Sequence, residues 1–203
     1  MEITEYNILT KSTEGYYKNK GSKFIAVAYY VETEDDVKDA MALVKKKYYD
    51  ARHHTYAYRI NPENEYTRSS DDGEPSGTAG KPILNQLLSF GLYNTLIVVV
   101  RYFGGTKLGV SGLILAYKSS TRDAIQSSKI VKVFITNSIK LSFEYPLMNN
   151  VMRVIKEEKV KIYKQDFTTD CKIYVKIKKD SLKIVLEKLT KIRGVIISRL
   201  ENN

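Results

Sequence analysis

Polar residues crowd into one stretch of the chain, RSSDDGEPSGTAGKPIL, which separates two regularly patterned segments. Its three acids, Asp71, Asp72 and Glu74, could bind Mg²⁺ because this hard cation prefers carboxylate oxygens. A catalytic metal here would suit a hydrolase or transferase that acts on a phosphorylated small molecule. Adjacent acids in a polar loop also serve as turn formers or as charges at helix ends. Both interpretations stay open from the sequence.

The same stretch is rich in glycine, as is a second one, GGTKLG, at 104–109. Each leads into a predicted helix, whose free N–H groups and dipole favour anions. The first is not a Walker A loop, because Pro75 stands where that motif needs its first glycine. We expect the two segments to meet in space and to hold a phosphate jointly, or else to serve tight turns and close packing. The candidate anion-binding residues are Ser76, Gly77, Thr78, Gly80, Lys81, Gly104, Gly105, Thr106 and Lys107.

Three further residue types could carry chemistry. Arg101 ends an apolar run, and a charge at the end of a buried strand needs a partner, which we expect among the three acids. His53 and His54 begin a strand and should point to opposite faces of the sheet, where one could act as a general base. The single cysteine, Cys171, excludes an internal disulfide and fits a reducing cytosol.

The elements that must position these residues form an α/β pattern up to residue 135. Thr33 begins a helix with a capping-box pattern. The run TLIVVVRYF is uninterrupted and β-branched, which indicates a central strand covered on both faces. The predicted strands are 22–31, 53–60, 65–70, 95–103 and 129–136, the last of them closing the domain, and the predicted helices are 34–48, 82–91 and 108–128.

Near Asn137 the pattern starts again. Strands are predicted at 138–144, 159–165, 171–178 and 195–200, with helices at 145–158 and 182–192. This βαββαβ order is that of a ferredoxin-like domain, in which two helices cover one face of a four-stranded sheet. The sequence therefore predicts two domains, 1–135 and 136–203.

The second domain carries most of the excess positive charge. The whole chain has a net charge of +10, and residues 136–203 hold 15 basic and 8 acidic side chains. Strand alternation puts lysines and tyrosines on the uncovered face of the sheet, a composition that suits single-stranded RNA. The alternative is a solvated face in a lysine-rich protein. The residues of this face are Lys140, Lys161, Tyr163, Lys172, Tyr174, Lys176 and Lys178.

No apolar run approaches the roughly 18 residues of a membrane helix, and the start of the chain lacks the pattern of a secretory signal. We therefore expect a cytoplasmic protein with no membrane contact.

Two long motifs carry a resemblance to a known family. SSDDGEPSGTAGKPIL, followed after a short helix by VVVRYFGGTKLGVSGL, resembles the signature of the YigZ/IMPACT family, and HTYAYRI upstream agrees. The resemblance covers about Lys23 to Ala124, and the C-terminal domain is similar to the smaller domain of the bacterial members. It implies an α+β chain, with a ribosomal protein S-five domain 2-like domain before the ferredoxin-like one. It also implies similarity of the pair to the fourth and fifth domains of elongation factor G, which work on the ribosome. Eukaryotic members of the family regulate translation.

These observations predict a binding module for an anionic partner, RNA or a ribosomal surface, in a translation-linked role. A protein of the translation machinery is a further kind of partner that such a role allows. No cofactor is expected, unless Mg²⁺ serves the alternative, a metal-assisted hydrolase or transferase.

Overall fold

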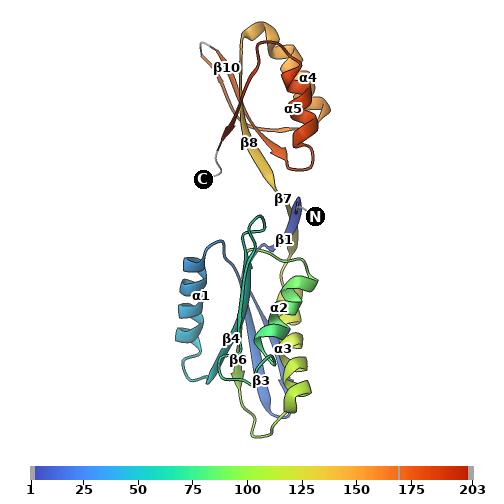
Figure 1. Ribbon diagram of the computed structural model, residues 1–203. Coiled ribbons are helices and arrows are strands. Elements are labelled where there is room, and N and C mark those ends of the chain that lie inside the picture. The colour runs from blue at the N-terminus through green and yellow to red at the C-terminus, as the bar shows by residue number, and fades with distance from the viewer. Residues whose placement is uncertain (1–2, 169, 201–203) are drawn as a thin grey trace. The chain divides into compact units, whose positions relative to one another are not determined.

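The chain folds into two compact units, divided between Val133 and Phe134. The computed structural model describes residues 3–168 and 170–200 (Figure 1). The division lies two residues before the expected boundary at 135/136.

A five-stranded sheet forms the centre of the first unit, and every neighbouring pair of strands is antiparallel. Helix α1 covers one face of the sheet, and helices α2 and α3 cover the other (Figure 1). The strands in spatial order are β2 (Thr13–Asn19), β3 (Ser22–Tyr30), β6 (Thr95–Tyr102), β4 (His53–Ile60) and β5 (Tyr66–Ser70). The helices are α1 (Glu34–Lys47), α2 (Gly80–Ser89) and α3 (Gly109–Gln126).

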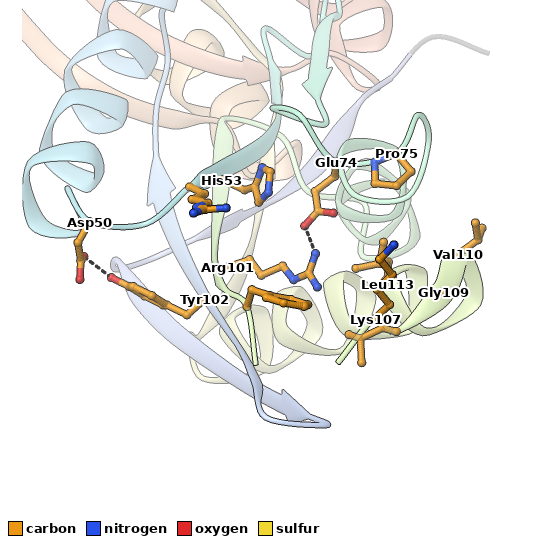
Figure 2. A pocket seen from close by; sticks show the side chains of 13 residues that line it. Asp50, His53, Glu74, Pro75, Arg101, Tyr102, Lys107, Gly109, Val110 and Leu113 are labelled. Carbon is orange, nitrogen blue, oxygen red and sulfur yellow. Dashed lines mark hydrogen bonds and ion pairs between the residues drawn. The ribbon is translucent and has the colours of Figure 1, made fainter. Parts of the chain in front are cut away.

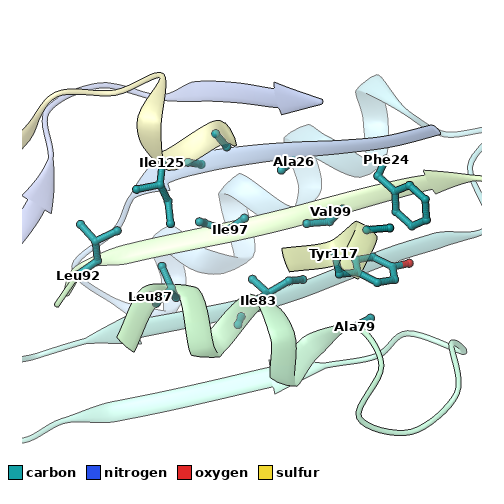
Figure 3. Close-up of a cluster of buried hydrophobic side chains, with 14 of the residues drawn as sticks. Phe24, Ala26, Ala79, Ile83, Leu87, Leu92, Ile97, Val99, Tyr117 and Ile125 are labelled. Atoms are coloured by element: carbon teal, nitrogen blue, oxygen red, sulfur yellow. The ribbon is translucent and has the colours of Figure 1, made fainter. Parts of the chain in front are cut away.

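Strand β6 is the central strand, as the uninterrupted apolar run predicts. Its residues are buried from Thr95 to Arg101 because helices lie against both faces of the sheet. Ile97 and Val99 face α2 and α3 (Figure 3), whereas the alternate residues pack toward α1. Its buried length ends at Arg101, at the edge of the hydrophobic core.

The N-terminal helix begins where the sequence predicts. The Thr33 side chain accepts a hydrogen bond from the Asp36 N–H, and the Asp36 side chain accepts one from the Thr33 N–H. This reciprocal pair satisfies N–H groups that the first turn leaves without intrahelical partners.

Two N-terminal strands were outside the sequence prediction, and they change the role of segment 129–136. Strand β2 occupies the edge of the sheet beside β3. Strand β1 (Glu5–Leu9) pairs with β7 (Ile130–Phe134) in a separate two-stranded sheet. The segment predicted as a single closing strand, 129–136, contains β7 and the start of β8, and β7 pairs with β1 instead of joining the large sheet. The strand ends at Phe134, and Thr136 already begins the next one.

The second unit has the predicted ferredoxin-like order. Its sheet has the spatial order β11-β8-β10-β9, and helices α4 and α5 lie on one face of it (Figure 1). Their apolar residues form a core with the inward side chains of the strands, such as Ile139, Leu141 and Ile173. The elements are β8 (Thr136–Phe143), a short 3-10 helix (Tyr145–Leu147), α4 (Met148–Glu157), β9 (Lys161–Phe167), β10 (Cys171–Lys178), α5 (Leu182–Thr190) and β11 (Ile196–Leu200). The chain is thus an α+β protein.

The structure predicts that Gly15 is required for stability. A Cβ atom at Gly15 would lie 2.1 Å from the backbone nitrogen of Ala124, because β2 passes directly against α3. Gly15→Ala should lower the free energy of unfolding by about 3 kcal/mol, the upper range for overpacking. Urea denaturation measures this loss. Lys18→Ala, an exposed position on the same strand, is the control and should change it by less than about 0.5 kcal/mol. Equal effects of the two substitutions would contradict the close approach.

Candidate functional site

A pocket of about 730 Å³ opens in the first unit where β6 leaves the sheet (Figure 2). Three stretches that are distant in sequence contribute to it: the connection after α1 with the start of β4, the polar loop between β5 and α2 (residues 71–79), and the segment from the end of β6 to the first turns of α3. The lining residues are Asp50, Arg52, His53, Glu74, Pro75, Arg101, Tyr102, Phe103, Lys107, Leu108, Gly109, Val110 and Leu113.

A buried ion pair forms one wall of this pocket. The Nη1 atom of Arg101 donates to Oε1 of Glu74 at 2.6 Å, and each residue is only 8% exposed. The predicted pairing of Arg101 with one of the three acids is thereby confirmed. The hydroxyl of Tyr117 donates to the same Oε1 at 2.7 Å. Burial raises the pKa of the Tyr117 phenol, and its hydrogen bond to Glu74 raises it further, so Tyr117 remains a neutral donor.

The second acid, Asp71, closes the polar loop on itself. Its carboxylate accepts hydrogen bonds from the N–H groups of Gly77 at 2.9 Å, Ala79 at 3.0 Å and Gly80 at 2.8 Å. Burial acts to raise the pKa of Asp71, but these backbone hydrogen bonds outweigh it, and the pKa is lowered. The carboxylate therefore occupies the place at the start of α2 that the sequence predicts for a bound anion.

The prediction that the first glycine-rich segment offers free N–H groups to a phosphate is accordingly wrong for Gly77 and Gly80. The Thr78 hydroxyl donates to the Pro75 carbonyl at 2.6 Å. None of the predicted anion-binding residues of this segment lines the pocket. These residues are Ser76, Gly77, Thr78, Gly80 and Lys81.

The third acid, Asp72, binds the start of β4. Its carboxylate accepts from the His54 N–H at 2.6 Å, and its carbonyl bonds Nδ1 of His53 at 2.7 Å. Because a carbonyl can only accept, Nδ1 of His53 is the donor of this hydrogen bond. His54 instead contacts the Tyr48 carbonyl through Nε2 at 3.0 Å.

The three acids thus bind three different partners instead of converging on one point. Within residues 3–168 and 170–200, no group of three or more His, Cys, Asp or Glu side chains is placed to hold a metal ion.

The second glycine-rich segment divides between packing and the pocket. A Cβ atom at Gly104 would lie 1.9 Å from the carbonyl carbon of Gly21, so Gly104 serves close packing. Gly105 and Thr106 do not line the pocket, whereas Lys107 and Gly109 do. The two segments therefore meet only in part, because the polar loop contributes Glu74 and Pro75 to the pocket and not its glycines.

The open face of the second unit is the other surface that the sequence singles out. The rings of Tyr163 and Tyr174 lie 6.2 Å apart between centroids. The Nζ atom of Lys176 lies 5.8 Å from the centroid of Tyr163, and that of Lys164 lies 5.2 Å from Tyr174. The inward positions of the neighbouring strands are buried in the core, as alternation predicts. At one end of the sheet, Lys178 lies 3.5 Å from the ring centroid of Phe134.

Sequence reasoning missed Lys164 because β9 carries a bulge. Tyr174 pairs with Lys164 and Val175 pairs with Ile162, which leaves Tyr163 as an extra residue. Strict alternation assigns Lys164 to the opposite face. The only signal in the sequence is that the apolar alternation of Val160 and Ile162 stops at residue 164.

Within the described residues, no helix is long and apolar enough to cross a membrane.

Comparison with known sequences gives matches over most of the chain. The sequence model of the Impact N-terminal domain matches residues 20–125. YvyE of Bacillus subtilis is 35% identical over 136 residues, which cover 67% of this chain and 63% of that protein. An IMPACT family member of Haemophilus influenzae is 31% identical over 84% of both chains. YigZ of Escherichia coli is 32% identical over 73% of this chain and 74% of its own.

Solved structures also match. The crystal structure of a hypothetical protein covers 99% of this chain and 100% of its own, with 26% identity and a TM-score of 0.65. The structure of the two-domain translational regulator Yih1 covers 59% of this chain and 48% of its own, with 26% identity and a TM-score of 0.41. The first match supports the α+β fold described above. The likeness to elongation factor G stays a prediction.

The buried ion pair yields a stability prediction. Arg101→Met should lower the free energy of unfolding by about 3 kcal/mol, because Glu74 would stay buried without its cation. Urea denaturation measures this loss. Arg52→Met removes an exposed cation from the same pocket and, as the control, should cost less than about 0.5 kcal/mol.

A double variant tests whether the two charges are coupled. Combining Arg101→Met with Glu74→Leu should restore part of the lost stability, since a buried ion pair can often be replaced by apolar residues of similar volume. If the losses of the two single variants simply add in the double variant, the pair is not coupled as described.

Proposed function

The chain belongs to the IMPACT family, and we propose that it binds RNA, free or exposed on the ribosome, through the open face of its second unit. One observation carries this proposal, the adjacent rings of Tyr163 and Tyr174 set among lysines. We infer a translational setting from the resemblance to the YigZ/IMPACT family, whose eukaryotic members regulate translation.

The tyrosines supply the surface on which bases can stack. Tyr163 is 45% exposed, and Tyr174 beside it is half-buried in the same face. The two ring planes are inclined by 58°, so each ring offers its own stacking surface. A base stacked on an aromatic side chain contributes roughly 1–3 kcal/mol to binding, with little dependence on base type. The face therefore suits unpaired bases of any sequence.

The lysines supply the positive charge that follows the phosphate backbone. They lie on neighbouring strands, and cross-strand pairs such as Lys161 with Lys176 bring them together in space. The same face also carries one acid, Asp166, which is the cross-strand neighbour of Lys172. Since most of the charges are positive, binding to a phosphate backbone should depend strongly on salt. The lysines of this face are Lys140, Lys161, Lys164, Lys172, Lys176 and Lys178.

The metal-assisted hydrolase or transferase has no comparable observation in its favour. It needs Asp71, Asp72 and Glu74 to share an ion, yet each carboxylate is engaged with a different part of the fold.

Removing the two rings should weaken RNA binding. The double variant Tyr163→Ala, Tyr174→Ala should bind a labelled single-stranded RNA at least about tenfold more weakly than the wild type, as expected from losing two stacked bases. Fluorescence anisotropy with the full chain measures the affinity. Tyr145→Ala is the control, because Tyr145 is 73% exposed and precedes α4, away from the strands. Unchanged affinity in the double variant would refute the proposed binding face.

Removing lysines should change the salt dependence instead. Lys164→Ala combined with Lys176→Ala should reduce the slope of log affinity against log salt by about 0.7 for each lost phosphate contact on a single strand. Titrations at several salt concentrations measure this slope. Lys183→Ala removes an exposed charge from α5 on the helix side and should leave the slope unchanged. An equal effect of Lys183→Ala would mean that binding follows net charge alone.

A further inference from the structure

We propose that the pocket of the first unit binds a mononucleotide, with its phosphate at the start of α3 and its base against Phe103. This site goes beyond the proposed RNA-binding function, because it lies wholly in the other unit and uses none of the residues of the lysine and tyrosine face.

The start of α3 provides the phosphate end of the pocket. The first N–H groups of a helix have no partner within it, and the helix dipole makes that end positive. Leu108 stands at the N-cap position and makes no side-chain hydrogen bond to them. Lys107, Leu108, Gly109 and Val110 all line the pocket, so this end of the helix faces the cavity. At α2 the corresponding place is occupied by the chain's own Asp71.

Arg101 provides a second and independent indication of a ligand. Its Nη1 atom donates to Glu74, but its Nε atom is buried and has no hydrogen-bond partner within the described residues. A buried donor without an acceptor is unfavourable, because it has lost its hydrogen bonds to water and gained none in the protein. Figure 2 shows the guanidinium group of Arg101 extending into the space that the labelled lining residues surround. Arg101 lines the pocket, so an oxygen-rich anion that enters this space would supply acceptors to its guanidinium group.

The charges of the pocket favour such an anion. Glu74 is neutralised by Arg101, and Asp50 accepts a hydrogen bond from the Tyr102 hydroxyl at 2.7 Å. The lining thus holds three cations, Arg52, Arg101 and Lys107, against two acids, Asp50 and Glu74, so its net charge is positive. A phosphate between these cations and the start of α3 would gain charge-assisted hydrogen bonds, which are stronger than neutral ones.

The rest of the pocket suits a sugar and an aromatic ring. Because Nδ1 of His53 donates to the Asp72 carbonyl, Nε2 is the ring atom left to form a hydrogen bond with a ligand hydroxyl, such as one of a ribose. Phe103 is 59% exposed at the pocket, and Pro75, Val110 and Leu113 add apolar surface. The volume of about 730 Å³ lies within the roughly 300–1,000 Å³ of small-molecule sites. Phosphate, hydroxyl and flat ring together are the chemistry of a mononucleotide.

Calorimetric titration of the full chain with AMP tests the proposal, with adenosine and ribose 5-phosphate as ligands that each lack one part. We expect AMP to bind more tightly than either. Lys107→Ala should weaken AMP binding about tenfold or more, the effect of losing one charge-assisted hydrogen bond. Lys118→Ala is the control, because it removes an exposed lysine from the same helix outside the pocket.

A second pair of variants separates binding from folding. Val110→Glu places a negative charge at the start of α3, which should stabilise the helix while it repels the phosphate. Leu115→Glu, at an exposed position later in the helix, is the matched control and should leave AMP binding unchanged. Phe103→Ala should weaken AMP binding but not ribose 5-phosphate binding.

The proposal is overturned if the wild type gives no binding heat with AMP at millimolar concentration. It is also overturned if Lys118→Ala weakens binding as much as Lys107→Ala. Loss of AMP binding in the Tyr163→Ala, Tyr174→Ala variant would assign the ligand to the other unit and would equally refute it. If that variant loses RNA binding but keeps AMP binding, the two sites are separate, as the proposal requires.

Discussion

The first unit depends on a buried ion pair between Arg101 and Glu74. Arg101 marks the point where the central strand runs out of apolar partners, and its charge can stay buried there only if an acid comes to it. Glu74 reaches it from the polar loop, which is thereby held against β6 and α3. Once the loop is held, Asp71 meets the backbone N–H groups at the start of α2, and Asp72 meets the start of β4. The acids that could have formed a metal site instead determine the shape of one side of the pocket.

Much of this arrangement could be predicted from the sequence. An uninterrupted apolar run identifies β6 as central, and the arginine that follows it indicates a buried charge in need of an acid. The sequence could not show which acid would pair, because all three lie within four residues of one another, far from Arg101 along the chain. Strand β2 escaped prediction because its pattern, TEGYYKN, reflects a contact with α3 at Gly15 that depends on tertiary structure. Lys164 was missed for a similar reason, since a bulge reverses the alternation that assigns side chains to faces.

The two candidate surfaces suit ligands of different shape. The pocket of the first unit is concave, with a buried arginine and a helix start, so it can bind a compact anion and replace part of its water with fixed donors. The face of the second unit is open and carries its tyrosines and lysines on neighbouring strands, so it can follow an extended chain of phosphates and bases. Binding in the pocket depends on its shape and its fixed hydrogen-bond donors, whereas binding on the open face depends on stacking and charge. Different substitutions therefore test the two sites. Fold membership alone would not distinguish them, because function lies in the sites that a fold carries.

The most direct test of RNA binding by the second unit is ultraviolet crosslinking of the full chain to a single-stranded RNA, followed by mapping of the crosslinked peptides. Crosslinks form at side chains in contact with bases, so the position of the adduct reports the binding face without any substitution. The account predicts adducts on the peptides that contain Tyr163 and Tyr174. Adducts confined to residues of the first unit, or to helices α4 and α5, would contradict it.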